Sequence, residues 1–357
     1  MSRFSVTRSR SHHQWRSGTV GLMRLLGMLL FISPIILTSG ACASSQPSSN
    51  QDRTSRAPTP PKPYVNASAP SHSPYDWRNF GETKQNWQLN DRAREWRGLD
   101  RTALNLQSAS ALIVDEQGNV LYSKNARTVR PIASITKLMT AMVVLDTGVS
   151  LNTRIRIVED DRDRLKNSRS RLRINDAVLS RREMIMVAIM SSDNRAAHAL
   201  GRTTFRAGTP AFIQAMNRKA RALGMNNTQF VDSSGLNPRN RSTAEDLVKM
   251  VRAASNYPLI RETTSRGEMT LRPFSDGTAL QYRNTNPLVR SSEWTVEVSK
   301  TGFINEAGRC LSMQTRIDNR RLYMVFLGAN GRLGPMGDSN RVREWILTSN
   351  GRTTAAR

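Results

Sequence analysis

The sequence has 357 residues and carries 53 basic against 28 acidic side chains, which gives a formal net charge of +25 at pH 7. This length suits one domain with extensions, or two small domains. The basic residues are spread along the chain without interleaved aromatic residues, so the pattern does not favour RNA binding and we expect no nucleic acid as a partner. The charge fits attraction to an acidic surface, and a solvated basic exterior is the alternative.

Residues 1–43 have the features of a secretory signal peptide. A basic leader precedes the apolar run 25–37, which is too short to span a bilayer comfortably. Small residues then mark a cleavage site, so we expect cleavage after Ala43 and a periplasmic protein with no stable membrane span. The alternatives are a lipoprotein acylated at Cys42 and an uncleaved anchor. Once the signal is removed, Cys310 is the only cysteine left and no internal disulfide is expected.

A polar segment separates this signal from the folded part. Seven of the fifteen prolines lie in residues 44–74 among many Ser, Asn and Gln residues, which is typical of a linker. Tryptophans then stand among charges, either in an extension that docks on the main domain or in an exposed tail. We therefore divide the chain into a signal peptide at 1–43, a linker and extension at 44–102 that includes Trp77, Trp87 and Trp96, a folded domain at 103–350 and a tail at 351–357.

The first elements of the folded domain form a recognisable pattern. Residues 110–123, "SALIVDEQGNVLYS", predict a hairpin that turns around Gly118. After Pro131, apolar residues at helical spacing predict a helix over about 134–146. Residues 154–174 alternate basic and apolar side chains, as in exposed strands and loops.

The rest of the domain changes from helices to strands. "Ser-Arg-Arg-Glu" at 180–183 and the stretch 242–245 both read as capping boxes that open helices. In chain order, we expect a helix to about Ser191, one over about 209–223, one after Ser242, a strand at 294–302, a hairpin over 309–329 and a last helix over about 338–348. Strands at both ends with helices between them predict an α+β fold, with one antiparallel sheet built from both ends of the domain and an inserted helical layer.

Ser134 and Lys137 are the first candidates for chemistry. Their spacing of three puts both side chains on one face at the start of a helix, where free N–H groups favour a developing negative charge. A serine hydroxyl needs a base, and arginine cannot deprotonate, whereas a lysine with a lowered pKa can accept the proton. The alternative is an ordinary helix start with a surface lysine, because such a pair arises by chance about once in a chain of this composition.

Two further groups stand later in the chain. In "SSDNRAAH", a loop after a buried helix can present Ser192 as a proton relay and Asn194 as a partner for a substrate amide. At the end of a strand, Lys300 and Thr301 can hold a carboxylate or carbonyl, and Gly302 allows a ligand to approach closely. Each group alone is weak. Together with Ser134 and Lys137 they follow the order and contexts of serine acyltransferases that react with penicillin.

Other catalytic mechanisms lack the residues that they require. Three of the four histidines precede the folded domain, and His198 stands alone, so neither a zinc cluster nor a Ser-His-Asp set can be proposed. We expect His198 to pack on its helix. No metal or other cofactor is expected.

From about residue 105 to 348, the chain resembles the low-molecular-mass penicillin-binding proteins, and most of all their D-alanyl-D-alanine endopeptidase branch, the penicillin-binding protein seven type. The likeness rests on "RPIASITKLMTAMVVLD", "MSSDNRAA", "GMNNTQFVDSSGL", "RNTNPLV" and "KTGFINEAGRCL". It implies a serine beta-lactamase/transpeptidase-like fold and the hydrolysis of D-Ala cross-links, with peptidoglycan peptides as substrate and beta-lactams as inhibitors. It also implies that Ser134 is acylated, that Lys137 is its base, that Ser192 and Asn194 assist, that Lys300, Thr301 and Gly302 bind substrate, and that the backbone N–H groups of Ser134 and Phe303 form the oxyanion hole.

Three alternatives stay open at this point. A D-Ala-D-Ala carboxypeptidase uses the same residues, although many such relatives carry a further domain and an amphipathic anchor, and only about ten residues follow the last helix expected here. A class A beta-lactamase needs a glutamate in a Glu-x-x-Leu-Asn stretch, whereas "DSSGLN" lacks the acid. A non-catalytic protein that binds the cell wall is the third, and the complete set of motifs argues against it.

Overall fold

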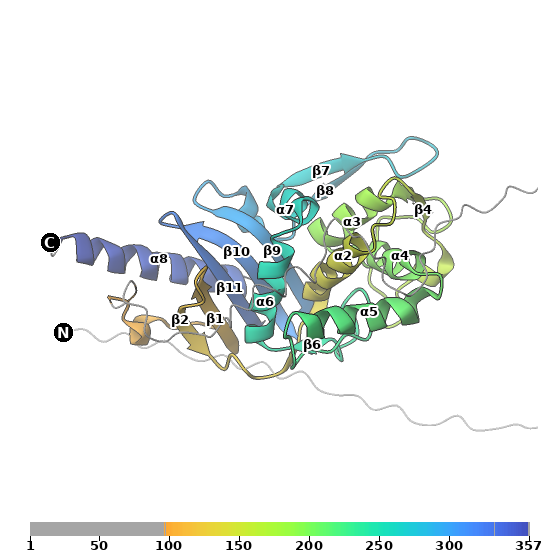
Figure 1. Cartoon of the computed structure of the whole chain (residues 1–357). Coiled ribbons are helices and arrows are strands. Elements are labelled where there is room, and N and C mark those ends of the chain that lie inside the picture. Colours follow the sequence, from red (N-terminus) through yellow and green to blue (C-terminus); the bar gives the residue numbers. More distant parts are fainter. Residues whose placement is uncertain (1–95, 97, 332, 356–357) are drawn as a thin grey trace, which may run out of the picture. The chain divides into compact units, whose positions relative to one another are not determined.

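The computed structural model describes residue 96, residues 98–331 and residues 333–355. A five-stranded antiparallel sheet in the order β2-β1-β11-β10-β9 forms the centre of this part of the chain (Figure 1). Two strands come from its start and three from its end, so the predicted sheet built from both ends of the domain is confirmed. The strands are β1 (Ser110–Asp115), β2 (Val120–Lys124), β9 (Thr295–Ile304), β10 (Gly308–Ile317) and β11 (Arg320–Ala329).

The chain between β2 and β9 forms the inserted helical layer. Its helices are α2 (Thr136–Asp146), α3 (Arg181–Met190), α4 (Asn194–Thr204), α5 (Gly208–Ala222), α6 (Ala244–Ala254) and α7 (Pro258–Ser265). Short strand pairs join them: β3 (Arg130–Pro131) with β6 (Arg241–Ser242), β4 (Arg154–Arg156) with β5 (Val178–Ser180), and β7 (Glu268–Leu271) with β8 (Leu280–Arg283). The short helices are η2 (Arg101–Ala103), η3 (Ala133–Ile135), η4 (Glu159–Asp161) and η5 (Pro287–Arg290).

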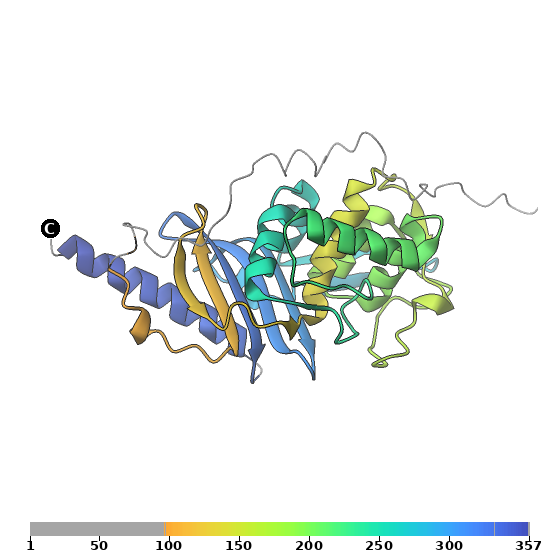
Figure 2. The ribbon, with the colours of Figure 1, turned by 60° about the horizontal axis from the view of Figure 1, so that its bottom comes forward.

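The sheet separates two hydrophobic cores. Side chains of a strand alternate between its two faces, so Leu112 and Val114 of β1 pack with the helical layer, whereas Ala111 and Ile113 pack on the opposite face. There α8 (Gly334–Ala355) covers the sheet and buries Trp345. Figures 1 and 2 show α8 and α6 on opposite sides of the strands.

Several predicted elements are confirmed and others are wrong in detail. The hairpin over 110–123 is present, and Ser180 caps α3 in a capping box with Glu183. The second predicted box is wrong, because Thr243 rather than Ser242 is the N-cap of α6, and its side chain accepts from the amide of Asp246. The expected last helix is too short, since α8 runs from 334 to 355. Helix α7 and the β7-β8 hairpin were not predicted.

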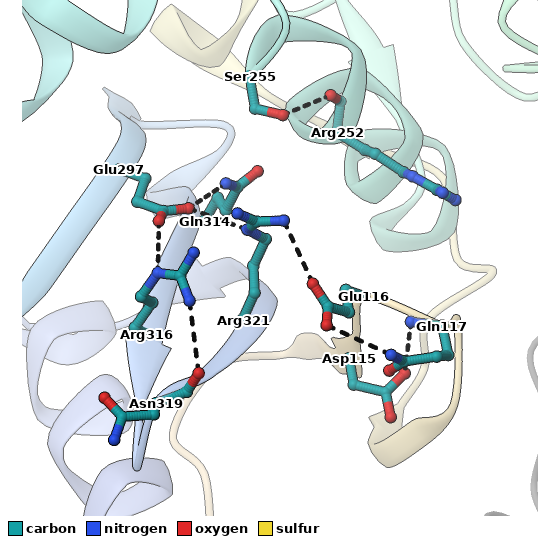
Figure 3. Close-up of polar contacts among 10 residues, drawn as sticks. All are labelled: Asp115, Glu116, Gln117, Arg252, Ser255, Glu297, Gln314, Arg316, Asn319 and Arg321. Atoms are coloured by element: carbon teal, nitrogen blue, oxygen red, sulfur yellow. Dashed lines mark hydrogen bonds and ion pairs between the residues drawn. The ribbon is translucent and has the colours of Figure 1, made fainter.

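A charged network ties the start of β9 to its neighbours (Figure 3). Glu297 receives hydrogen bonds from Arg316 on β10 and Arg321 on β11, at 2.7 and 3.1 Å, and a further one from Gln314. Arg321 also reaches Glu116 at 3.2 Å, in the turn between β1 and β2. One carboxylate therefore links the three C-terminal strands, and through Arg321 the network extends to the N-terminal hairpin.

Residues before the first strand pack on the sheet. The side chain of Trp96 is buried, and its indole N–H donates to the Asp115 carboxylate at 2.8 Å. Trp77 and Trp87 lie outside the described residues, and so do Cys42, the signal region and the cleavage position. Within the described ranges, no helix is both long and apolar enough to cross a bilayer.

Candidate active site

Ser134 and Lys137 lie where the chain passes from η3 into α2. The Lys137 Nζ is 2.8 Å from the Ser134 Oγ, as the spacing of three predicts. Ala133, directly before the serine, has φ of 46°, in the left-handed region that residues other than glycine rarely adopt. Backbone strain of this kind costs about 1–3 kcal/mol and concentrates at functional sites.

The Lys137 side chain is fully buried and its Nζ has three partners. Besides Ser134, it donates to the Asn194 Oδ1 and to the Ser234 carbonyl oxygen, both at 2.6 Å. The Asn194 amide nitrogen donates in turn to the Ser168 Oγ at 2.7 Å, which fixes the orientation of the amide. Ser168 thus holds the Asn194 oxygen toward Lys137.

Burial changes the protonation of both lysines at the site. It lowers the pKa of Lys137 from 10.5 to about 7, against the opposing charges of the Asp232, Asp193 and Asp163 carboxylates. Burial also sets the pKa of Lys300 well below its ordinary value, and the positive charge of Lys137 lowers it further. A lysine with a pKa near 7 is partly neutral at neutral pH, so Lys137 can accept a proton.

The expected loop that carries Ser192 and Asn194 is shorter than predicted. Asn194 is already the first residue of α4, because the Asp193 carboxylate caps that helix by accepting from the Ala196 amide at 3.0 Å. Ser192 remains in the turn, with φ of 63°. This N-cap was not predicted, although an Asp before a helical run is a recognised start signal.

Lys300 and Thr301 lie on β9. Lys300 is buried, and its Nζ donates to the Ser192 Oγ at 2.9 Å and to the Thr301 carbonyl oxygen at 2.7 Å. The Thr301 hydroxyl donates to the Thr285 Oγ1 at 2.7 Å. The three predicted motifs therefore meet through direct contacts: Ser134 with Lys137, Lys137 with Asn194, and Ser192 with Lys300.

Gly302 brings β9 against the turn that carries the serine. A Cβ on Gly302 would stand 2.9 Å from the Ile132 carbonyl oxygen and 3.1 Å from the Ser134 nitrogen. The next residue, Phe303, is 51% exposed.

Some residues of the site were not predicted. The Asp232 carboxylate accepts from the amides of Ser234 and Gly235, at 2.7 and 2.5 Å, and so shapes the turn whose carbonyl contacts Lys137. The motif "DSSG" carries an ordinary turn signal that could have indicated this. No local sequence pattern indicated Ser168 or Thr285, because each contacts a site residue that is distant in sequence, Asn194 and Thr301 respectively.

His198 lies on α4 beside this turn. Its Nε2 is 3.0 Å from the Ser234 Oγ, and burial lowers its pKa below the ordinary value. Among the described residues, no three His, Cys, Asp or Glu side chains are grouped so that they could hold a metal ion.

Known proteins are similar to this chain in sequence. Residues 99–331 match the family described as D-alanyl-D-alanine carboxypeptidase. A D-alanyl-D-alanine endopeptidase of Escherichia coli is 46% identical over 246 residues, which cover 68% of this chain and 78% of the relative. A D-alanyl-D-alanine endopeptidase of Pseudomonas aeruginosa is 43% identical over 251 residues, which cover 70% of this chain and 80% of the relative.

Solved structures share the fold. The crystal structure of a Streptomyces DD-transpeptidase superposes with a TM-score of 0.62 at 25% identity, over 68% of this chain and 98% of that one. A D-alanyl-D-alanine carboxypeptidase of Mycobacterium tuberculosis gives 0.60 at 22% identity, over 68% and 92%, and supports the fold alone. The expected transpeptidase-like α+β fold is thus confirmed. On the family match and on relatives above 40% identity, the chain belongs to the D-alanyl-D-alanine carboxypeptidase family of serine peptidases.

Proposed function

We propose that this protein is a serine DD-endopeptidase that hydrolyses D-alanyl cross-links in peptidoglycan. The observation that carries the proposal is the contact of 2.8 Å between the Ser134 Oγ and the buried Lys137 Nζ, whose pKa is about 7. The relatives at 43% and 46% identity are named for this activity.

The hydrogen bonds of Lys137 support its role as the base. A neutral amine has two N–H groups and one lone pair. The Asn194 Oδ1 and the Ser234 carbonyl oxygen can only accept hydrogen bonds, so they take the two N–H groups. The lone pair is then left for the third neighbour, the Ser134 hydroxyl, whose proton it can accept.

Acylation would proceed through one tetrahedral intermediate. The Ser134 oxygen attacks the carbonyl of the D-Ala at the scissile bond while its proton passes to Lys137. The backbone N–H groups of Ser134 and Phe303 hold the oxyanion, each donor contributing about 3 kcal/mol. The C–N bond then breaks, and the departing amine takes the proton that Lys137 accepted from Ser134, passed on through the Ser192 hydroxyl, which lies 2.9 Å from the Lys300 Nζ.

Deacylation would reverse these roles. Water attacks the ester and gives a proton to Lys137, the bond between the carbonyl carbon and the Ser134 oxygen breaks, and Lys137 returns the proton to the serine oxygen. Before the amine departs, Lys300 and Thr301 hold the carboxylate of the residue that follows the scissile bond, and Gly302 serves the site differently from the expected ligand approach, because it lets β9 lie against the turn that carries Ser134. A beta-lactam enters the same route, but its amine stays tethered to the acyl group, so the adduct lasts and the enzyme is inhibited.

Digestion of purified sacculi tests the proposal. Wild-type protein should convert cross-linked dimers into monomers, and the Ser134→Ala protein should leave them intact. Shortening of pentapeptides to tetrapeptides with dimers untouched would instead assign the activity of a D-Ala-D-Ala carboxypeptidase, the name that the family carries.

We also infer that the protein works in the periplasm, where peptidoglycan lies. The support is the signal-like pattern of residues 1–43, with acylation of Cys42 as the alternative. Mass spectrometry of the mature protein checks this: a chain that begins at Ser44 supports cleavage after Ala43, and a lipid-modified Cys42 contradicts it.

A further inference from the structure

A cavity of about 330 Å³ opens directly beside Ser192. Three segments line it: residues 169–171, the turn 191–193 between α3 and α4, and residues 281–283 at the end of β8. Because the Ser192 Oγ also accepts from the Lys300 Nζ, the cavity continues the candidate active site outward along one side.

Three arginines are among the residues that line this cavity. Arg169 makes no hydrogen bond or ion pair with another residue of the described ranges. Arg171 donates to the Gln281 carbonyl oxygen at 2.5 Å, and its guanidinium lies 5.4 Å from the centre of the Tyr282 ring. These two contacts hold the Arg171 side chain in place. Neither partner is a carboxylate, so neither neutralises the charge of the guanidinium.

The carboxylates around the cavity do not cancel this charge. Arg283 is 3.6 Å from Glu268, but both side chains are largely exposed, so their attraction is weak. Asp193 is buried, and its oxygens accept from the Ala196 amide and from the Ser170 hydroxyl. A cavity with this balance favours a ligand that carries negative charge.

The position of Ser192 tells which part of the substrate meets the cavity. In the proposed mechanism, the Ser192 hydroxyl passes a proton to the departing amine, so the group attached to that amine leaves past Ser192. A carboxypeptidase releases a single D-alanine there, whose carboxylate Lys300 and Thr301 already hold. An endopeptidase releases a whole peptide strand, which carries further carboxylates.

We propose that Arg169, Arg171 and Arg283 form a subsite for a second carboxylate, on the departing peptide strand, and that this subsite favours cross-linked over terminal substrates. The inference rests on the proposed function. It also gives part of the strongly basic surface a purpose: attraction of the anionic strand to the side of the site where it must lie.

A comparison of two substrates in two enzymes tests the subsite. One substrate is a cross-linked dimer with all its carboxylates free. In the other, the carboxylates of the departing strand are amidated, and only the carboxylate next to the scissile bond stays free. The enzymes are the wild type and the double variant Arg169→Gln/Arg283→Gln, with Arg218→Gln as the control, because Arg218 is an exposed arginine on α5 outside the cavity. The readout is kcat/KM for each pair, with the rate of beta-lactam acylation as a check on the fold.

The wild type and Arg218→Gln should cleave the free dimer on the order of tenfold faster than the amidated one, the effect of one charge-assisted hydrogen bond. The double variant should lose most of this preference, because only Arg171 of the three arginines remains. Equal rates in the wild type, or undiminished discrimination in the double variant, would overturn the subsite. A wild type that is acylated by the beta-lactam but leaves both dimers intact would defeat the proposed function instead. The amidation arm needs no variant, so a failure of the double variant to fold leaves the test in force.

Discussion

Gly302 lies in backbone contact with the turn that carries Ser134: a Cβ on Gly302 would stand 3.1 Å from the Ser134 nitrogen. Its closest neighbour would be the Ile132 carbonyl oxygen at 2.9 Å, which is also backbone and cannot move aside as a flexible side chain can. Only glycine therefore allows β9 to approach so closely. The proposed oxyanion hole depends on this approach, because it needs the amides of Ser134 and Phe303 to face one oxygen.

Replacing Gly302 with alanine should separate these two amides. We expect the acylation rate of Gly302→Ala to fall by on the order of a hundredfold, the loss typical of one oxyanion donor. Covalent labelling with a fluorescent penicillin measures the rate. Gly337→Ala is the control, because its Cβ would meet only the flexible end of Arg341, at 3.5 Å. Labelling of Gly302→Ala at the wild-type rate would contradict the proposed geometry.

The pKa of Lys137 predicts a pH dependence with a definite sign. Burial holds this pKa at about 7, and only the neutral amine can accept the Ser134 proton. The rate of penicillin acylation should therefore rise with pH and level off above about 7. The folded pKa lies below the unfolded value of 10.5, so the same group should make the fold more stable as pH rises from about 7 to 10.5.

Two substitutions separate charge from basicity at this position. Lys137→Arg keeps a positive charge that cannot be given up, so acylation should fall by roughly 100- to 10,000-fold, the range of a lost general base. Lys137→Met should lose acylation as well, and it should also lose the rise in stability above pH 7, measured by urea unfolding at several pH values. Acylation by Lys137→Arg at near the wild-type rate would exclude Lys137 as the base.

The sequence carried the parts of the site that depend on local spacing. Ser134 and Lys137 meet because one helical turn joins them, and the order of strands and helices was enough to predict a sheet made from both ends of the domain. The contacts between motifs follow from the fold, and no local pattern encodes them. Ser168, for example, orients Asn194 across 26 residues.

The errors in the elements have physical causes too. Helix α7 begins with Pro258 after an uncapped Tyr257, so the signals of a capped start are missing. At α6, Ser242 and Thr243 are adjacent and both can cap a helix. Ser242 pairs with Arg130 in the β3-β6 strand pair, so Thr243 becomes the N-cap of α6. This pairing cannot be predicted from the sequence.

Gly235 should be more sensitive to substitution than other glycines with positive φ. It has φ of 83°, and a Cβ there would overlap the Ala133 carbonyl group. Gly148 has φ of 66° and open space around the same position, so Gly148→Ala reports the backbone strain alone, about 1 kcal/mol. We expect Gly235→Ala to lower the free energy of unfolding by about 3 kcal/mol or more, because a clash is added to the strain. If urea unfolding shows the same loss of unfolding free energy for the two variants, the clash at Gly235 contributes nothing and the prediction is wrong.

Glu297 allows a test of stability away from the candidate site. Burial acts to raise the pKa of its carboxyl group, but the hydrogen bonds from Gln314 and Arg316 and the charge of Arg321 prevail and lower it below 4.5. A carboxylate with a lowered pKa stabilises the fold above its unfolded pKa, and this stability is lost as the pH falls through the folded value.

Glu297→Gln should therefore cost about 1 kcal/mol at pH 7, the upper range for a partly exposed ion pair. The difference from the wild type should shrink toward zero near pH 2, where the wild-type side chain is protonated as well. Urea unfolding at both pH values measures it. Glu293→Gln serves as the control, because Glu293 is 66% exposed and its oxygen lies 3.6 Å from Arg343, so little change is expected at either pH. An equal cost of Glu297→Gln at both pH values would mean that Glu297 acts through packing rather than through its charge.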